Sequence, residues 1–145
     1  MFSLDTNILV YAANRDCLEH PRALALVEKA LSEPERWLVA EQVLLEFYKA
    51  LRHPKILSRP MSPAEAIGQV RFLRKNSGMQ IVTSDLSFWD EIEEHLESPG
   101  LGYQRTFDVV LGVTLRMSGV KTFYTRNTRD FAGIGFERVI NPIDT

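Results

Sequence analysis

Four acidic or amide positions occur in short segments that are far apart along the chain, each at or near the expected end of a strand or helix. The segments are Ser3-Leu4-Asp5-Thr6-Asn7, Leu44-Leu45-Glu46-Phe47, Thr106-Phe107-Asp108-Val109 and Thr125-Arg126-Asn127-Thr128-Arg129-Asp130-Phe131. In a parallel α/β fold these positions converge at one end of the sheet, where such folds bind their ligands. Clustered carboxylates without cationic partners either destabilise the fold or bind a hard divalent cation.

Each of these residues also has an ordinary structural interpretation. Asp5 can cap the helix that follows it, and Asp108 can favour the N-terminus of its helix by about 0.3–1 kcal/mol. Glu46 lies on a flank of an apolar helix face, where a glutamate is often simply solvated. Asn127 and Asp130 fit a charged turn. The chemical interpretation therefore depends on whether the segments come together.

An alternation of short strands and helices must position these residues. Strands are predicted at 2–4, 37–39, 79–82, 120–124 and 136–140, and helices at 8–13, 22–31, 41–51, 63–75, 88–96 and 108–118, the last with Thr106 as its cap. Gly78 and Gly119 each follow a helix and precede a short apolar strand. Helix, glycine and strand in this order favour crossover units and a parallel sheet. The expected fold is a three-layer α/β sandwich with a central parallel sheet.

Composition limits the class of protein. A chain of 145 residues fits one domain. Its net charge of −2 argues against a surface that binds nucleic acid everywhere and does not exclude a local basic patch. The sequence has neither a membrane-spanning apolar run nor a secretory signal at its start. Cys17 stands alone, so a disulfide framework and a cysteine zinc site are both excluded. A cytoplasmic protein is expected.

Taken together, these segments resemble the PIN-domain family, and within it the VapC-like toxins of bacterial toxin–antitoxin pairs. The resemblance rests on residues 4–12 (LDTNILVYA), Glu46, Asp108, Thr125-Arg126-Asn127 with Asp130-Phe131, and Asn141-Pro142. It covers nearly the whole chain and implies a single PIN-like domain over residues 1–145. It also implies a metal-dependent endoribonuclease that hydrolyses RNA phosphodiester bonds.

The resemblance assigns roles to individual positions. Asp5, Glu46 and Asp108 match the three recurrent acidic positions, which implies that they bind Mg²⁺ or Mn²⁺ and act in catalysis. A fourth position varies between aspartate and asparagine in the family; here it is Asn127, while Asp130 lies close enough to supply a catalytic carboxylate. The supporting positions are expected to be Thr6, Asn7, Thr125 and Asn127.

The resemblance also implies partners. RNA is the expected substrate, attacked by a metal-activated water, and the candidate RNA contacts are Arg15, Arg105, Arg126 and Arg129. A cognate antitoxin protein is expected to cover the acidic cleft, a homodimer is the expected assembly, and a membrane partner is not expected. The three histidines do not form a paired acid–base set, which disfavours a metal-free nuclease.

Two other classes stay open at this point. A phosphatase or phosphotransferase of haloacid-dehalogenase type also places an aspartate after the first strand and uses Mg²⁺, but it needs a second acid where this chain has Asn7. The other class is a non-catalytic PIN-like module that only binds RNA. Phosphorylation of Asp5 would support the first alternative, and full activity of an Asp5→Asn variant would support the second.

Overall fold

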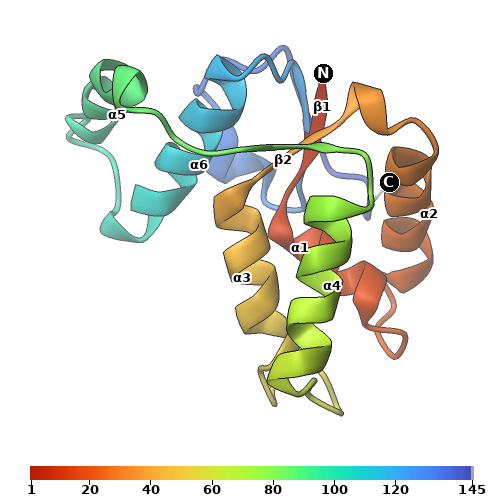
Figure 1. Ribbon diagram of the computed structural model, residues 1–145. Helices are drawn as coiled ribbons and strands as arrows, with labels where there is room; N and C mark the ends of the chain where they lie inside the picture. Colours follow the sequence, from red (N-terminus) through yellow and green to blue (C-terminus); the bar gives the residue numbers. More distant parts are fainter. Residues whose placement is uncertain (145) are drawn as a thin grey trace.

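The computed structural model describes residues 1–144 as an α/β fold with short parallel strands joined by helices (Figure 1). The strands are β1 (Phe2–Leu4), β2 (Leu38–Ala40), β3 (Gln80–Val82), β4 (Thr122–Tyr124) and β5 (Arg138–Ile140). The α-helices are α1 (Thr6–Ala13), α2 (His20–Ser32), α3 (Glu41–Leu51), α4 (Pro63–Lys75), α5 (Trp89–Leu96) and α6 (Thr106–Met117). Four 3-10 turns are interspersed: η1 (Pro34–Arg36), η2 (Leu86–Phe88), η3 (Tyr103–Arg105) and η4 (Thr128–Phe131).

The strands form two parallel sheets rather than the one continuous sheet expected. The larger sheet has the order β1-β4-β5, and the smaller one pairs β2 with β3. A single parallel bridge between Phe2 and Trp37 connects them. The aromatic rings of these two residues are 5.2 Å apart, and Trp37 also stacks on Tyr124 at 5.6 Å, so side-chain packing continues where the hydrogen-bond ladder stops.

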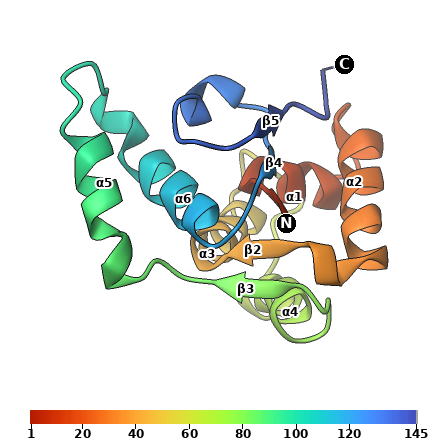
Figure 2. The same cartoon turned by 90° about the horizontal axis from the view of Figure 1, so that it is seen from above.

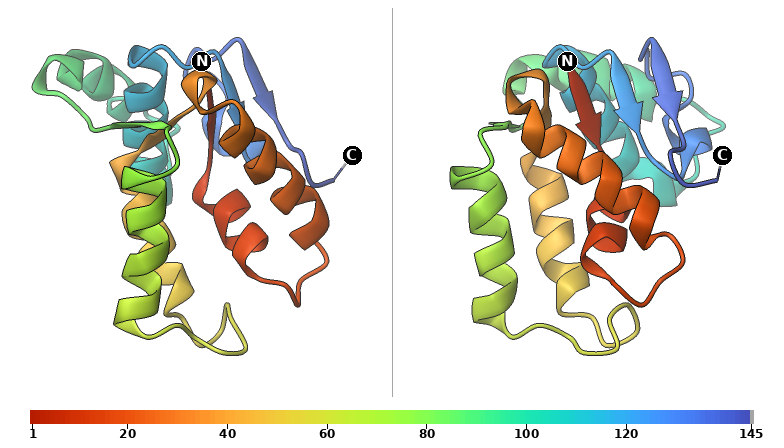
Figure 3. Two further views of the ribbon diagram at one scale, coloured as in Figure 1. Left: turned by 45° about the vertical axis from the view of Figure 1, so that its right-hand side comes forward. Right: turned by 90° about the vertical axis from the view of Figure 1, so that its right-hand side faces the viewer.

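Helices lie on both sides of the strands, with α5 and α6 on one side and α2 on the other (Figure 2). The three strands of the larger sheet run side by side in one direction, toward the end where α1 begins (Figure 3). The core between these layers includes fully buried Leu4, Trp37 and Phe123. Burying a side chain of this size contributes about 1.5–3 kcal/mol, so the core holds the strand ends in fixed relative positions.

Local sequence signals explain several helix boundaries. Ser62 and Glu65 form a reciprocal capping box at the start of α4. Gly78 and Gly119, with φ angles of +80° and +102°, adopt the left-handed conformation that ends a helix before a strand. The expectation that Thr106 caps α6 is wrong, because Thr106 is the first residue of that helix and its hydroxyl donates to the Tyr103 carbonyl instead.

Within residues 1–144, none of the helices has both the length and the apolar character needed to cross a bilayer.

Candidate active site

Beside the carboxyl ends of β1 and β4 lies a cavity of about 400 Å³ that is lined by three of the four predicted acidic residues, Asp5, Glu46 and Asp108. Asp5 follows β1 directly, Glu46 projects from the middle of α3, and Asp108 lies in the first turn of α6. Asn127 reaches the same cavity from the turn after β4. The complete lining consists of Asp5, Thr6, Asn7, Val10, Tyr11, Glu46, Ala50, Ile56, Asp108 and Asn127.

Asp5 is the most buried of these carboxylates, with 7% of its surface exposed. Its Oδ1 accepts a 2.7 Å hydrogen bond from the backbone N–H of Thr6, and its Oδ2 accepts one of 2.7 Å from the Thr125 hydroxyl. Asp5 therefore does cap α1. Burial raises the pKa of Asp5 to about 6, with smaller contributions from the charges of Glu46 and Asp108 and partial relief from the two hydrogen bonds.

Glu46 is exposed at the mouth of the cavity, but both of its carboxylate oxygens are held. The Thr6 hydroxyl donates to Oε2 at 2.8 Å, and the Gln42 side-chain amide donates to Oε1 at 3.2 Å. Thr6 thus links the two carboxylates, because its backbone N–H donates a hydrogen bond to Asp5 and its hydroxyl donates one to Glu46. Gln42 was not predicted as a site residue. The available signal was its position one helical turn before Glu46.

Asp108 is partly buried, and its surroundings are acidic. Burial raises the pKa of Asp108, followed by the charges of Asp130 and Glu46, while Arg105 counteracts them. Asp130 lines a neighbouring hollow with Asn127 rather than the main cavity. Arg105 holds Asp130 there: its Nη2 donates to the Asp130 carbonyl at 2.6 Å, and its Nε lies 3.7 Å from the Asp130 carboxylate.

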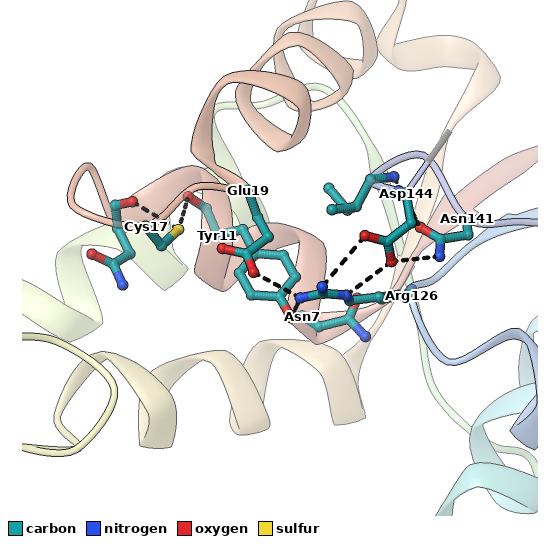
Figure 4. A network of polar contacts seen from close by, with 9 residues as sticks. Asn7, Tyr11, Cys17, Glu19, Arg126, Asn141 and Asp144 are labelled. Carbon is teal, nitrogen blue, oxygen red and sulfur yellow. Dashed lines mark hydrogen bonds and ion pairs between the residues drawn. The ribbon is translucent and has the colours of Figure 1, made fainter.

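The four arginines predicted to contact RNA differ in their surroundings, and Arg126 has the most protein partners. The guanidinium of Arg126 is engaged by Glu19 at 2.8 Å, Asp144 at 3.1 Å and the Tyr11 hydroxyl at 3.0 Å (Figure 4). Its backbone N–H also donates to the side-chain oxygen of Asn7 at 3.5 Å. Arg126 therefore ties α1, the segment before α2 and the C-terminal segment to the turn after β4.

The other arginines have different surroundings. Arg105 is held against Asp130, whereas Arg129 is exposed in the hollow formed by residues 126–130. Arg15 is exposed beside a separate hollow that also includes Ser58 and Arg59. None of the four arginines lines the cavity that contains the carboxylates, and Arg15 and Arg129 are the two with the greater exposure to solvent.

The chemistry of the lining suits a hard divalent cation. Among residues 1–144, no three His, Cys, Asp or Glu side chains are grouped as a ready-made metal cage. Mg²⁺ does not need such a cage, because it usually keeps several waters and binds one or two carboxylates together with substrate phosphates. Two carboxyl groups with raised pKa values, facing a third in an open cavity, form an oxygen-only donor set of this kind.

Comparison with known proteins assigns the chain to a family. The family model for the PIN domain matches residues 3–137, and this chain belongs to the PIN-domain family. The chain is also similar to Ribonuclease VapC24 of Mycobacterium tuberculosis, with 38% identity over 143 residues that cover 99% of this chain and 97% of that protein.

Solved structures agree on the fold. VapC20 of Mycobacterium tuberculosis, described as a toxin that cleaves the sarcin–ricin loop, superposes with a TM-score of 0.70 at 18% identity, covering 94% of this chain and 96% of that one. FitAcB from Neisseria gonorrhoeae gives a TM-score of 0.68 at 16% identity and covers both chains completely. The expected α/β fold of PIN type is therefore confirmed.

Proposed function

We propose that this chain is an endoribonuclease of the VapC type, the toxin of a toxin–antitoxin pair, that hydrolyses RNA with the help of Mg²⁺ or Mn²⁺. The observation that carries the proposal is the meeting of Asp5, Glu46 and Asp108, from three separate elements, in one open cavity. Similarity over nearly the full length to a ribonuclease supports the same activity.

In this proposal Asp5, Glu46 and Asp108 would hold the cation, and hydrogen bonds from the protein orient the first two. Thr125 and the Thr6 backbone fix the two oxygens of Asp5, so its carboxylate can turn little. A bound metal ion would lower the pKa of a water molecule and stabilise the charge that develops on the scissile phosphate. Hydrolysis of this kind would leave 5′-phosphate and 3′-hydroxyl ends.

The fourth position is shared by two residues in this proposal. Asn127 contributes an uncharged amide to the cavity wall. Asp130 adds negative charge beside Asp108 and remains the candidate for a fourth catalytic carboxylate, although Arg105 partly neutralises it. Asn7 has a supporting role, because its side-chain oxygen receives the Arg126 N–H.

RNA would enter across the exposed mouth. Arg15 and Arg129 are the stronger candidates for phosphate contacts because their side chains are exposed, and guanidinium groups bind phosphate oxygens in pairs. Arg105 and Arg126, also predicted from the sequence as RNA contacts, have their guanidinium groups engaged by protein carboxylates. A single-stranded region is the expected target, since unstacked bases can reach the site.

The partners follow from the same proposal. A cognate antitoxin would cover the acidic cavity, and a second copy of the chain would complete a homodimer. Partly exposed aromatic side chains on two helices, Phe72 on α4 and Trp89 on α5, offer apolar surface for such contacts. The whole of residues 1–145 would act as one PIN-like domain.

The test uses the purified chain and a labelled single-stranded RNA with Mn²⁺, with Mg²⁺, or with chelator. Metal-dependent cleavage to 5′-phosphate ends, lost in Asp5→Asn, supports the proposal. A phosphorylated Asp5 trapped with a phosphate ester would favour the haloacid-dehalogenase alternative. RNA binding without cleavage at any metal concentration would favour a non-catalytic module.

A further inference from the structure

One side chain connects the two helices that carry Glu46 and Asp108. The Gln42 amide nitrogen donates to Glu46 Oε1 at 3.2 Å and to the backbone carbonyl of Phe107 at 3.1 Å. Phe107 immediately precedes Asp108 in the first turn of α6. Gln42 therefore joins α3, which carries Glu46, to the residue before Asp108 in α6, 65 positions further along the sequence.

The orientation of this amide is determined by its partners. A carboxylate oxygen and a backbone carbonyl both only accept hydrogen bonds, so the nitrogen of Gln42, with its two hydrogens, must face both. Glu46 then has a donor on each oxygen, since Thr6 occupies Oε2. Without these donors an exposed glutamate would sample several rotamers, and a metal ion would have to immobilise it at an entropic cost.

We propose that Gln42 is a positioning residue for the metal site: it holds the Glu46 carboxylate toward the cavity and fixes α3 against the start of α6. This inference rests on the proposed function, because it assigns Gln42 a role in binding the cation. Outer hydrogen-bond partners of metal-binding carboxylates change metal affinity by about 10-fold to 100-fold when they are removed.

A merely local role for Gln42 makes a different prediction. Gln42 and Glu46 are four residues apart on one helix, and such pairs add a small amount to helix stability without any effect on a ligand. That role predicts a slightly lower melting temperature and unchanged metal binding. Metal affinity, measured by calorimetry with Mn²⁺ alone, therefore distinguishes positioning from helix stabilisation.

The experiment compares Gln42→Met, which keeps the side-chain length but removes the donor, with wild type. Gln42→Ala serves as a second variant in case the thioether packs poorly, because alanine is well tolerated in helices. Gln69→Met is the matched control, since Gln69 is an exposed glutamine on α4. Circular dichroism establishes that each variant is folded. Each Gln42 variant is also made in a Glu46→Gln background.

We expect Mn²⁺ to bind Gln42→Met and Gln42→Ala about 10-fold more weakly than wild type, with little change in Gln69→Met. In the Glu46→Gln background the same substitution should weaken Mn²⁺ binding less, because the part of the effect that Gln42 exerts through the Glu46 carboxylate is already lost. Wild-type affinity in both variants would overturn the inference, and so would an undiminished loss in the Glu46→Gln background. A wild-type chain that neither binds Mn²⁺ nor cleaves RNA would instead overturn the proposed function itself.

Discussion

The hydroxyl of Thr125 lies 2.7 Å from Oδ2 of Asp5, which joins the residue after β4 to the residue after β1 across 120 positions of sequence. Thr125 is completely buried, and Asp5 nearly so. Because β1 and β4 are paired along their length, this contact is set by the register of the sheet. One carboxylate oxygen is thereby fixed by strand pairing and the other by the start of α1.

Replacing Thr125 with valine removes this hydroxyl and keeps the shape of the side chain. We expect RNA cleavage to fall about 10-fold to 100-fold, because Asp5 loses the donor that orients it. Cleavage rates at saturating Mn²⁺ give the comparison, and Thr125→Ser, which keeps the hydroxyl, should recover most of the activity. Equal rates for the valine and serine variants would show that the hydroxyl is not needed.

Asp5→Asn should abolish cleavage and yet stabilise the metal-free protein near pH 7.5. Burial, with the charges of Glu46 and Asp108, raises the pKa of Asp5 from 3.8 to about 6 despite its two hydrogen bonds, and this net change makes the ionised form about 3 kcal/mol less favourable in the folded protein. Asparagine avoids that cost and can still accept from the Thr6 N–H. Thermal melting in chelator measures the gain. A lower melting temperature than wild type would contradict this assignment of the cost to the Asp5 charge.

The same pKa predicts how stability depends on pH. Between about pH 4 and pH 6 folded Asp5 keeps a proton that the unfolded chain has released, so this residue lowers the stability of the metal-free protein as the pH rises through that window. The loss is complete above about pH 6. Melting curves of wild type and Asp5→Asn across pH 4–8 should diverge over this range.

Divalent cations should reverse this loss, because a ligand that binds only the folded state stabilises it. At pH 7.5 millimolar Mn²⁺ should raise the melting temperature of wild type and leave that of Asp5→Asn nearly unchanged. Ca²⁺, which prefers more oxygen ligands at longer distances, is the control for general charge screening. Equal shifts in both proteins would place the cation elsewhere.

Substitutions that change the charge of Asn127 or Asp130 test which of the two residues contributes to Mn²⁺ binding. Asp130→Asn removes a negative charge near Asp108 and should weaken Mn²⁺ binding several-fold, whereas Asn127→Asp adds a carboxylate to the cavity and should strengthen it. Calorimetry on both variants gives the comparison. If only the change at Asn127 alters Mn²⁺ affinity, the fourth position belongs to Asn127 alone.

Substitution of Arg126 should lower the stability of the fold, whereas substitution of Arg129 should weaken RNA binding. Arg126→Met breaks contacts to Glu19, Asp144 and Tyr11, so we expect a lower melting temperature. Arg129→Met should leave the melting temperature close to wild type and weaken RNA binding with a smaller salt dependence, as for a lost phosphate contact. Fluorescence anisotropy at several salt concentrations, with catalytically inactive Asp5→Asn as background, measures the second effect. A stable Arg126→Met variant with weak RNA binding would return Arg126 to the RNA contacts.

The sequence predicted the α/β fold and the order of its elements because its turns and helix ends carry strong local signals, such as Gly78 and Gly119. The expected positions of Asp5, Glu46 and Asp108 at one end of a parallel sheet also predicted that they lie together, and the three line one cavity. The engagement of Arg126 was not predictable in the same way, because Glu19 and Asp144 meet it only through tertiary packing. Gln42 was missed because its second partner is a backbone carbonyl, which sequence patterns do not display.

The division of the strands has a consequence for how wide the cavity can become. Asp5 and Thr125 follow strands of the larger sheet, whereas Gln42 and Glu46 belong to the helix after β2, in the smaller one. Within residues 1–144, one β-bridge, between Phe2 and Trp37, joins the two ladders, and Trp37 packs on Tyr124 beside it. A small rotation at this joint would move Glu46 relative to Asp5 while both ladders stay intact. A substitution in the packing of Trp37 against Phe2 and Tyr124 would therefore change the spacing of acidic residues that it does not touch.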